Sequence, residues 1–142
     1  MIGGQVLDLD AEGTRLDVET LEDLHRRKTG ALLSASVLAG GHCAGASEQQ
    51  IDALRQYGEH LGLAFQIMDD VLDVTGSGES LGKSPGKDAR SGKPTFASIL
   101  GLPGSRQRAR ELSQAANKAV ATLGQGSTAL QHLARFVVER SS

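Results

Sequence analysis

The chain has 142 residues, and its 39% hydrophobic content is enough to build one core, which argues against a disordered protein. A formal net charge of -2 and an aromatic content of 3% argue against nucleic-acid binding, which needs basic surface and stacking side chains. No apolar run approaches the ~18 residues of a membrane span, and the one cysteine, Cys43, permits no internal disulfide, so we expect a cytoplasmic protein.

Apolar residues recur at helical spacing along nearly the whole chain, without the period-two alternation of strands, so we predict an all-α protein. The first segment, GGQVLDL, indicates the end of a helix, and DAEGT indicates a loop. Asp17 can cap a helix over 18–40 that ends at Gly40 and Gly41, with Gly30 permitting a bend.

Ser47 is expected to cap the longest helix, because glutamate and glutamines follow it and the apolar periodicity then continues to Val74. Gly76 should end this helix. The segment 76–94 is rich in glycine, serine and lysine, which predicts a mobile loop. Three shorter helices, with a GLPGS turn after the first, are expected at about 95–100, 106–123 and 128–140.

Three aspartates, Asp69, Asp70 and Asp73, lie near the end of the longest helix. At 100° per residue they share one stripe with Gln66, opposite the apolar face. Like charges at this spacing, close to a helix C-terminus, repel one another, whereas a divalent cation would make the arrangement favourable. Magnesium fits, because one or two carboxylates usually hold it together with substrate phosphates. A solvated acidic helix end remains the alternative, because DDxxD alone is a weak signal.

Basic residues accompany the acidic cluster. Lys28 and Thr29 share one helical turn, and Lys83, Lys87, Arg90 and Lys93 follow the aspartates in the predicted loop. A diphosphate would use both kinds of partner, with metal ions on one side and lysines on the other. Considered singly, each basic segment could equally be a solvated face or a plain linker.

Four segments in order resemble the trans-isoprenyl diphosphate synthases, also called polyprenyl synthetases, of the bacterial farnesyl and geranylgeranyl diphosphate type. They are GGQVLDLDAEG, LHRRKTGALL, GLAFQIMDDVLDVTG and LGKSPGKDARSGKPTFASILGL. The resemblance implies an all-α bundle around a deep apolar cavity, a homodimer, and magnesium as cofactor. It implies head-to-tail condensation of isopentenyl diphosphate with an allylic diphosphate, without a protein nucleophile.

The resemblance also implies roles for individual residues. Asp69, Asp70 and Asp73 would bind magnesium with the allylic diphosphate. Lys28, Thr29 and Gln66 would act in catalysis, the lysine on the diphosphate and the other two in orienting the allylic substrate. The full set implied in substrate binding is Gln5, Lys28, Thr29, Gln66, Lys83 and Lys93.

The resemblance extends only to the C-terminal half of that domain. The first aspartate-rich motif, the arginine pair after it and an upstream Gly-Lys-Arg segment have no counterpart in the chain, and Met1 matches an internal position. We therefore expect 1–142 to be the C-terminal portion of a single synthase domain, inactive by itself. The alternative is a non-catalytic helical subunit or truncated paralogue that acts as an interaction module.

Overall fold

The computed structural model describes residues 2–11, 13–14, 16–75 and 93–140, and within these ranges it is all-α with no strand, which confirms the predicted fold class. The elements are α1 (Ile2–Asp10), α2 (Val18–His25), the π-helical turn η1 (Arg26–Gly30), α3 (Ala31–Cys43), α4 (Glu48–Thr75), α6 (Phe96–Val120), the 3₁₀ segment η2 (Ala121–Ser127) and α7 (Thr128–Glu139). None of the described helices combines the length and hydropathy needed to cross a bilayer.

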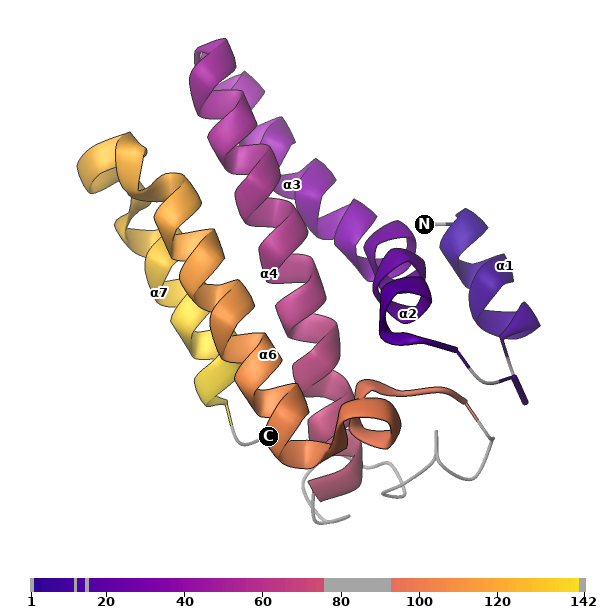
Figure 1. The fold of residues 1–142 in the computed structure, drawn as a ribbon. Coiled ribbons are helices and arrows are strands. Elements are labelled where there is room, and N and C mark those ends of the chain that lie inside the picture. Colours follow the sequence, from indigo (N-terminus) through magenta and orange to yellow (C-terminus); the bar gives the residue numbers. More distant parts are fainter. Residues whose placement is uncertain (1, 12, 15, 76–92, 141–142) are drawn as a thin grey trace.

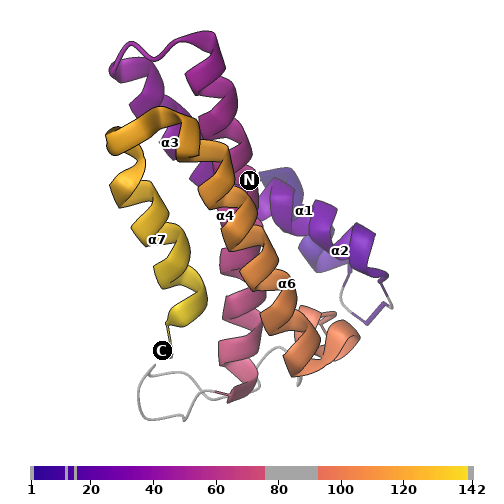
Figure 2. The same cartoon turned by 60° about the vertical axis from the view of Figure 1, so that its left-hand side comes forward.

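Helix α4 forms the centre of the bundle. It packs against α3 on one side and against α6 and α7 on the other, while α1 and α2 lie beside η1 (Figures 1 and 2). Its buried face includes Leu61, Ile67, Met68 and Val71, which join α6 residues such as Phe96 in one apolar core. Burial of this continuous face is the main source of stability, at roughly 25 cal/mol per Å² of apolar surface.

The predicted start of α4 is confirmed. The Gln50 backbone N–H donates to the Ser47 hydroxyl at 3.4 Å, and the Ser47 backbone N–H donates to the Gln50 side chain at 2.9 Å. This reciprocal pair satisfies N–H groups that the first helical turn leaves without partners. Asp17 likewise caps α2 as predicted, accepting the Thr20 N–H at 2.8 Å.

Gly30 allows a close crossing of two helical segments. It lies in a helical conformation, with φ -58°, at the end of the π-turn. A Cβ on Gly62 of α4 would lie 2.6 Å from the Gly30 Cα, and a Cβ on Gly58 would lie 2.7 Å from the Ser34 Cα. Glycines therefore let the backbone of α4 touch that of η1 and α3, closer than ordinary side chains permit.

One predicted helix end is wrong, and another is confirmed. Helix α3 continues through Gly40 and Gly41 to Cys43, because Gly41 is buried against Leu54 at the crossing with α4 and does not end the helix. The turn comes at Gly45, whose φ of 71° suits glycine. The predicted break after Leu100 is confirmed at Gly101, whose φ of 68° interrupts α6, and the helix resumes with Pro103, still within GLPGS.

Long-range polar contacts fix α2 and α7 to this framework. The buried Glu22 carboxylate accepts hydrogen bonds from Arg26 at 2.7 Å and from Arg108 of α6 at 2.7 and 3.0 Å. The Tyr57 hydroxyl of α4 donates to the Leu130 carbonyl of α7 at 2.8 Å. These contacts join α2 to η1 and α6, and α4 to α7.

Candidate functional site

Two predicted diphosphate-binding lysines meet at one carboxylate. Lys28 of η1 donates to Oδ2 of Asp8 at 2.7 Å, and Lys93, just before α6, donates to the same oxygen at 3.2 Å. The two ammonium nitrogens are therefore separated by no more than two hydrogen-bond lengths. Segments far apart in the sequence thus bring two positive charges to one point, as diphosphate binding would require.

Asp8 is the residue that sequence reasoning missed. Burial raises the pKa of its carboxyl group, but hydrogen bonds and the charges of Lys28 and Lys93 outweigh this effect, so the pKa lies below its ordinary value. A signal was present: α1, IGGQVLDLD, has no basic residue, so an acidic residue there that becomes buried must find its partner elsewhere.

A close backbone contact places Asp8 beside Lys28. A Cβ on Gly4 would lie 2.5 Å from the Lys28 backbone nitrogen, so α1 can approach η1 only with glycine at this position. Asp8 follows one helical turn later, on the same side of α1. The predicted pocket residue Gln5 is exposed on α1, and its side chain makes no hydrogen bond with the described residues.

The structure brings Thr29 and Gln66 together in a hydrogen-bonded chain that ends at Asp70. The Thr29 hydroxyl donates to Gln66 Oε1 at 3.0 Å, and Gln66 Nε2 donates to Asp70 Oδ1 at 3.3 Å. The second oxygen of Asp70 accepts the backbone N–H of Phe96 at 2.9 Å. This chain joins η1, α4 and α6, so it fixes the orientation of the Gln66 amide.

The structure shows that the three predicted aspartates are not equivalent. Asp70 is only 4% exposed and lies in the contact between α4 and α6, where the first N–H of α6 attracts a negative charge. The side chain of Asp69 is 61% exposed, and Asp73 is half-buried one turn further on. In the part of the chain that the structure describes, no three His, Cys, Asp or Glu side chains form a metal-binding group.

A site of two carboxylates still fits magnesium. Asp69 and Asp73 are four residues apart on one helix, which places both on the same face, and magnesium is commonly held by one or two carboxylates and by phosphate oxygens. Near Asp69 lies Arg140, whose Nη2 is 3.7 Å from Asp69 Oδ1 and whose guanidinium stacks 4.4 Å above the Phe65 ring. This arginine partly neutralises the charge of Asp69.

His25 lies behind the lysine pair and was also missed by sequence reasoning. Its ring is 5% exposed and 5.5 Å from the Phe96 ring, and neither ring nitrogen has a hydrogen-bond partner among the residues that the structure describes. Burial and the positive charge of Lys28 lower its pKa to about 4. His25 is therefore neutral at pH 7 and supports Phe96 by packing.

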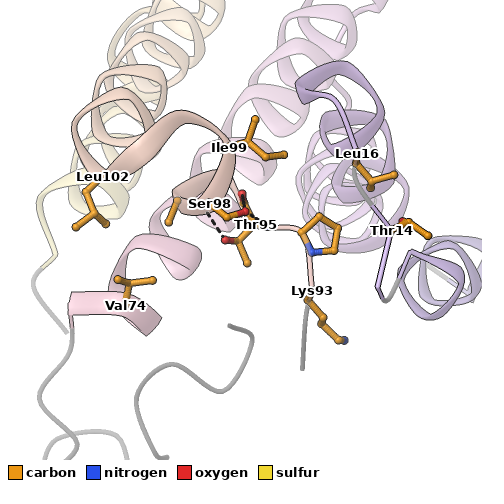
Figure 3. Close-up of a pocket in the computed structure, with 10 residues that line it drawn as sticks. Thr14, Leu16, Val74, Lys93, Thr95, Ser98, Ile99 and Leu102 are labelled. Atoms are coloured by element: carbon orange, nitrogen blue, oxygen red, sulfur yellow. Dashed lines mark hydrogen bonds between the residues drawn. The ribbon is translucent and has the colours of Figure 1, made fainter. Parts of the chain in front are cut away.

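A pocket of about 660 Å³ opens beside this site, between the end of α4, the segment that enters α6, and the loop after α1. Lys93 and Thr95 line it together with apolar side chains that include Leu16, Val74 and Leu102 (Figure 3). Lys93 thus borders both this pocket and Asp8. Lys83, Lys87 and Arg90, and most of the predicted mobile loop, lie outside the described residues.

Comparison with known proteins gives consistent matches. The family model for polyprenyl synthetase matches residues 1–133. The farnesyl diphosphate synthase of Escherichia coli is 43% identical over 99% of this chain and 48% of its own length. The geranylgeranyl diphosphate synthase of Cyanophora paradoxa is 41% identical over 100% of this chain and 48% of its own. The chain thus spans about half the length of these curated relatives.

A solved structure matches the fold. The geranyltransferase of Helicobacter pylori, complexed with magnesium and isoprenyl diphosphate, aligns with a TM-score of 0.80 and 34% identity. The alignment covers 97% of this chain and 45% of that one. The described helices therefore follow the arrangement found in part of that larger chain.

Proposed function

The chain belongs to the polyprenyl synthetase family, and from this premise we propose that it forms the C-terminal half of a short-chain isoprenyl diphosphate synthase. The proposed reaction is head-to-tail condensation of isopentenyl diphosphate with an allylic diphosphate to give farnesyl or geranylgeranyl diphosphate. In the whole enzyme, which we expect to be a homodimer, this half would bind the allylic diphosphate.

The observation that carries this proposal is the convergence of Lys28 and Lys93 beside Thr29 and Gln66. A lysine ammonium has three donor hydrogens, so each lysine can bond to Asp8 and also to a diphosphate oxygen. Hydrogen bonds from the two lysines would fix the leaving group and stabilise the charge it gains as the allylic bond breaks.

We assign magnesium binding to Asp69 and Asp73. Asp70 stays a predicted ligand, and the hydrogen bond that it accepts from Phe96 joins α4 to α6. The metal would supply positive charge that neutralises the departing diphosphate. The Thr29–Gln66–Asp70 chain would hold the Gln66 amide toward the allylic substrate. Release of Asp69 from Arg140 would free a carboxylate for the metal.

Exposed apolar side chains support a role as one half of a domain. Most of them lie on α1, α3 and α7, where they include Ile2, Val6, Leu9, Leu32, Leu133 and Phe136. The relatives extend over about twice the length of this chain, and we propose that their other half covers these side chains. That half would also supply the first aspartate-rich motif, so the chain alone should not catalyse condensation.

The proposal is tested first by binding. Calorimetry should show that inorganic diphosphate and magnesium each tighten the binding of the other. Asp69→Asn and Asp73→Asn should each weaken this coupling about tenfold, by removal of one ligand charge. Asp52→Asn is a matched control, because Asp52 is an exposed carboxylate near the other end of α4. Equal coupling in all variants would contradict the assigned metal ligands.

Activity is tested by complementation. The chain is incubated with dimethylallyl and isopentenyl diphosphates and magnesium, alone and mixed with the N-terminal half of the Escherichia coli relative. Product in the mixture alone would support the split-domain proposal, and product from the chain alone would refute the requirement for a second half. Stable association without product would favour the alternative, a non-catalytic interaction module, to which the exposed apolar side chains also point.

A further inference from the structure

We propose that Asp8 is an internal counter-ion that makes diphosphate binding at the Lys28–Lys93 pair depend on a divalent cation. The inference rests on the proposed diphosphate site and concerns its regulation. Its basis is a single atom: Oδ2 of Asp8 accepts hydrogen bonds from both lysines, at 2.7 and 3.2 Å. An anion that binds these lysines must therefore bind beside a fixed negative charge.

The position of Asp8 makes this charge effective. Its side chain is 15% exposed, and the side chains of both lysines are about one quarter exposed, so water screens the interactions only partly. Asp8 cannot easily turn away, because the contact of Gly4 with the Lys28 backbone fixes α1 against η1. The carboxylate is also held in its charged form, since the two lysines lower its pKa.

The repulsion depends on the charge of the ligand. Free diphosphate is strongly anionic near neutral pH, whereas magnesium neutralises much of that charge. Coulomb energy is proportional to the ligand charge, so Asp8 disfavours the free anion more than the magnesium complex. The lysine pair would therefore admit diphosphate chiefly with its metal, and diphosphate that has lost its metal after the reaction would be repelled by Asp8 and released.

The test measures the dissociation constant of inorganic diphosphate with and without magnesium. Asp8→Asn keeps the shape of the side chain and removes its charge. It should tighten binding of free diphosphate about tenfold and binding of the magnesium complex no more than about threefold, so the dependence on magnesium falls. Asp8→Glu retains the charge and should retain the dependence on magnesium.

Asp23→Asn is the matched control for net charge. Asp23 forms an exposed ion pair with Arg27 at 2.8 Å, and within the described part of the chain the ion pairs of Lys28 and Lys93 are with Asp8. Because exposed charges are screened within about 8–10 Å at physiological salt, this variant should leave the magnesium dependence unchanged. Circular dichroism confirms that each variant is folded, and Asp8→Ser replaces Asp8→Asn if the latter loses helicity.

A second measurement needs no ligand. Loss of Asp8 removes the carboxylate oxygen that accepts a hydrogen bond from both ammonium groups, so Lys28 and Lys93 should be acylated faster in Asp8→Asn, while the exposed Lys118 should react at the same rate. Mass spectrometry of peptides gives the three rates. Unchanged rates at Lys28 and Lys93 would overturn the counter-ion role, because they would show that Asp8 does not pair with them in solution.

The outcomes separate the inference from the proposed function. Binding of the magnesium complex to the unaltered chain, with the same magnesium dependence in Asp8→Asn, would overturn the inference and leave the proposed site standing. Loss of dependence in Asp8→Glu or Asp23→Asn as well would also overturn it, because local charge would not be the cause. Absence of diphosphate binding in the unaltered chain and in every variant would refute both.

Discussion

The carboxylate of Asp70 accepts a hydrogen bond from the backbone N–H of Phe96 at 2.9 Å, so an acidic residue of α4 provides the acceptor for an N–H group in the first turn of α6. This contact is buried, and the neighbouring oxygen of Asp70 accepts a hydrogen bond from Gln66. An aspartate in an acidic motif thus connects two helices, a role distinct from that of the exposed Asp69. The two residues should therefore respond differently to substitution.

Asp70→Ala should destabilise the fold by roughly 1–3 kcal/mol, because it leaves the Phe96 N–H without its buried partner. The loss should occur with or without magnesium. Asp69→Ala, at an exposed position, should change stability by less than about 0.5 kcal/mol. Urea unfolding followed by circular dichroism measures both. Equal losses in the two variants would contradict the structural role of Asp70.

Gly62→Ala should destabilise the fold by about 1–3 kcal/mol, because its Cβ would meet the Gly30 backbone at 2.6 Å and the two helices would have to separate. Gly40→Ala provides the contrast, since α3 has open space at Gly40 and alanine favours helix by up to about 1 kcal/mol. Thermal unfolding should show opposite shifts for the two variants. Similar shifts would exclude a tight crossing at Gly62.

His25 should make the fold sensitive to mild acid. Its folded-state pKa of about 4 lies below the ordinary 6.5, so between these values the unfolded chain binds the proton more readily. The stability that neutral His25 contributes is complete above pH 6.5. On acidification to pH 4 the free energy of unfolding should fall by an amount on the order of 3 kcal/mol. His25→Leu should show a flatter dependence over this range, while His132→Leu, at an exposed position, should follow the unaltered chain. Unfolding curves are measured at several pH values. If His25→Leu showed the same pH dependence of stability as the unaltered chain, His25 would not be responsible.

Leu32→Ser should impair complementation without unfolding the chain. Leu32 is exposed on α3, and its replacement should change stability by less than about 0.5 kcal/mol but weaken association with the N-terminal half of a relative about tenfold. Arg55→Ser, at an exposed polar position on α4, is the control. Affinity measured by calorimetry should distinguish them. Equal affinity for all three chains would show that the α3 face is not covered by that half.

Local sequence patterns predicted much of the architecture. The apolar periodicity around Leu61 and Ile67 predicted α4 nearly to its end, and the residues after Ser47 predicted its cap. The predicted end at Gly40 was wrong, whereas the break predicted after Leu100 occurs at Gly101. A glycine can end a helix or allow close packing within it, and only the neighbouring element, such as Leu54 against Gly41, determines which.

The sequence by itself determined the all-α class, the family and the types of residue at the site, because helical periodicity and ordered motifs are properties of short segments. Tertiary structure decided which of these residues meet. Asp8 pairs with Lys28 and Lys93, which are 20 and 85 residues away in the sequence. Asp70 bonds to the backbone at the start of α6. Such contacts depend on how helices cross and on which buried polar groups need a partner, and the pattern within one helix contains neither piece of information.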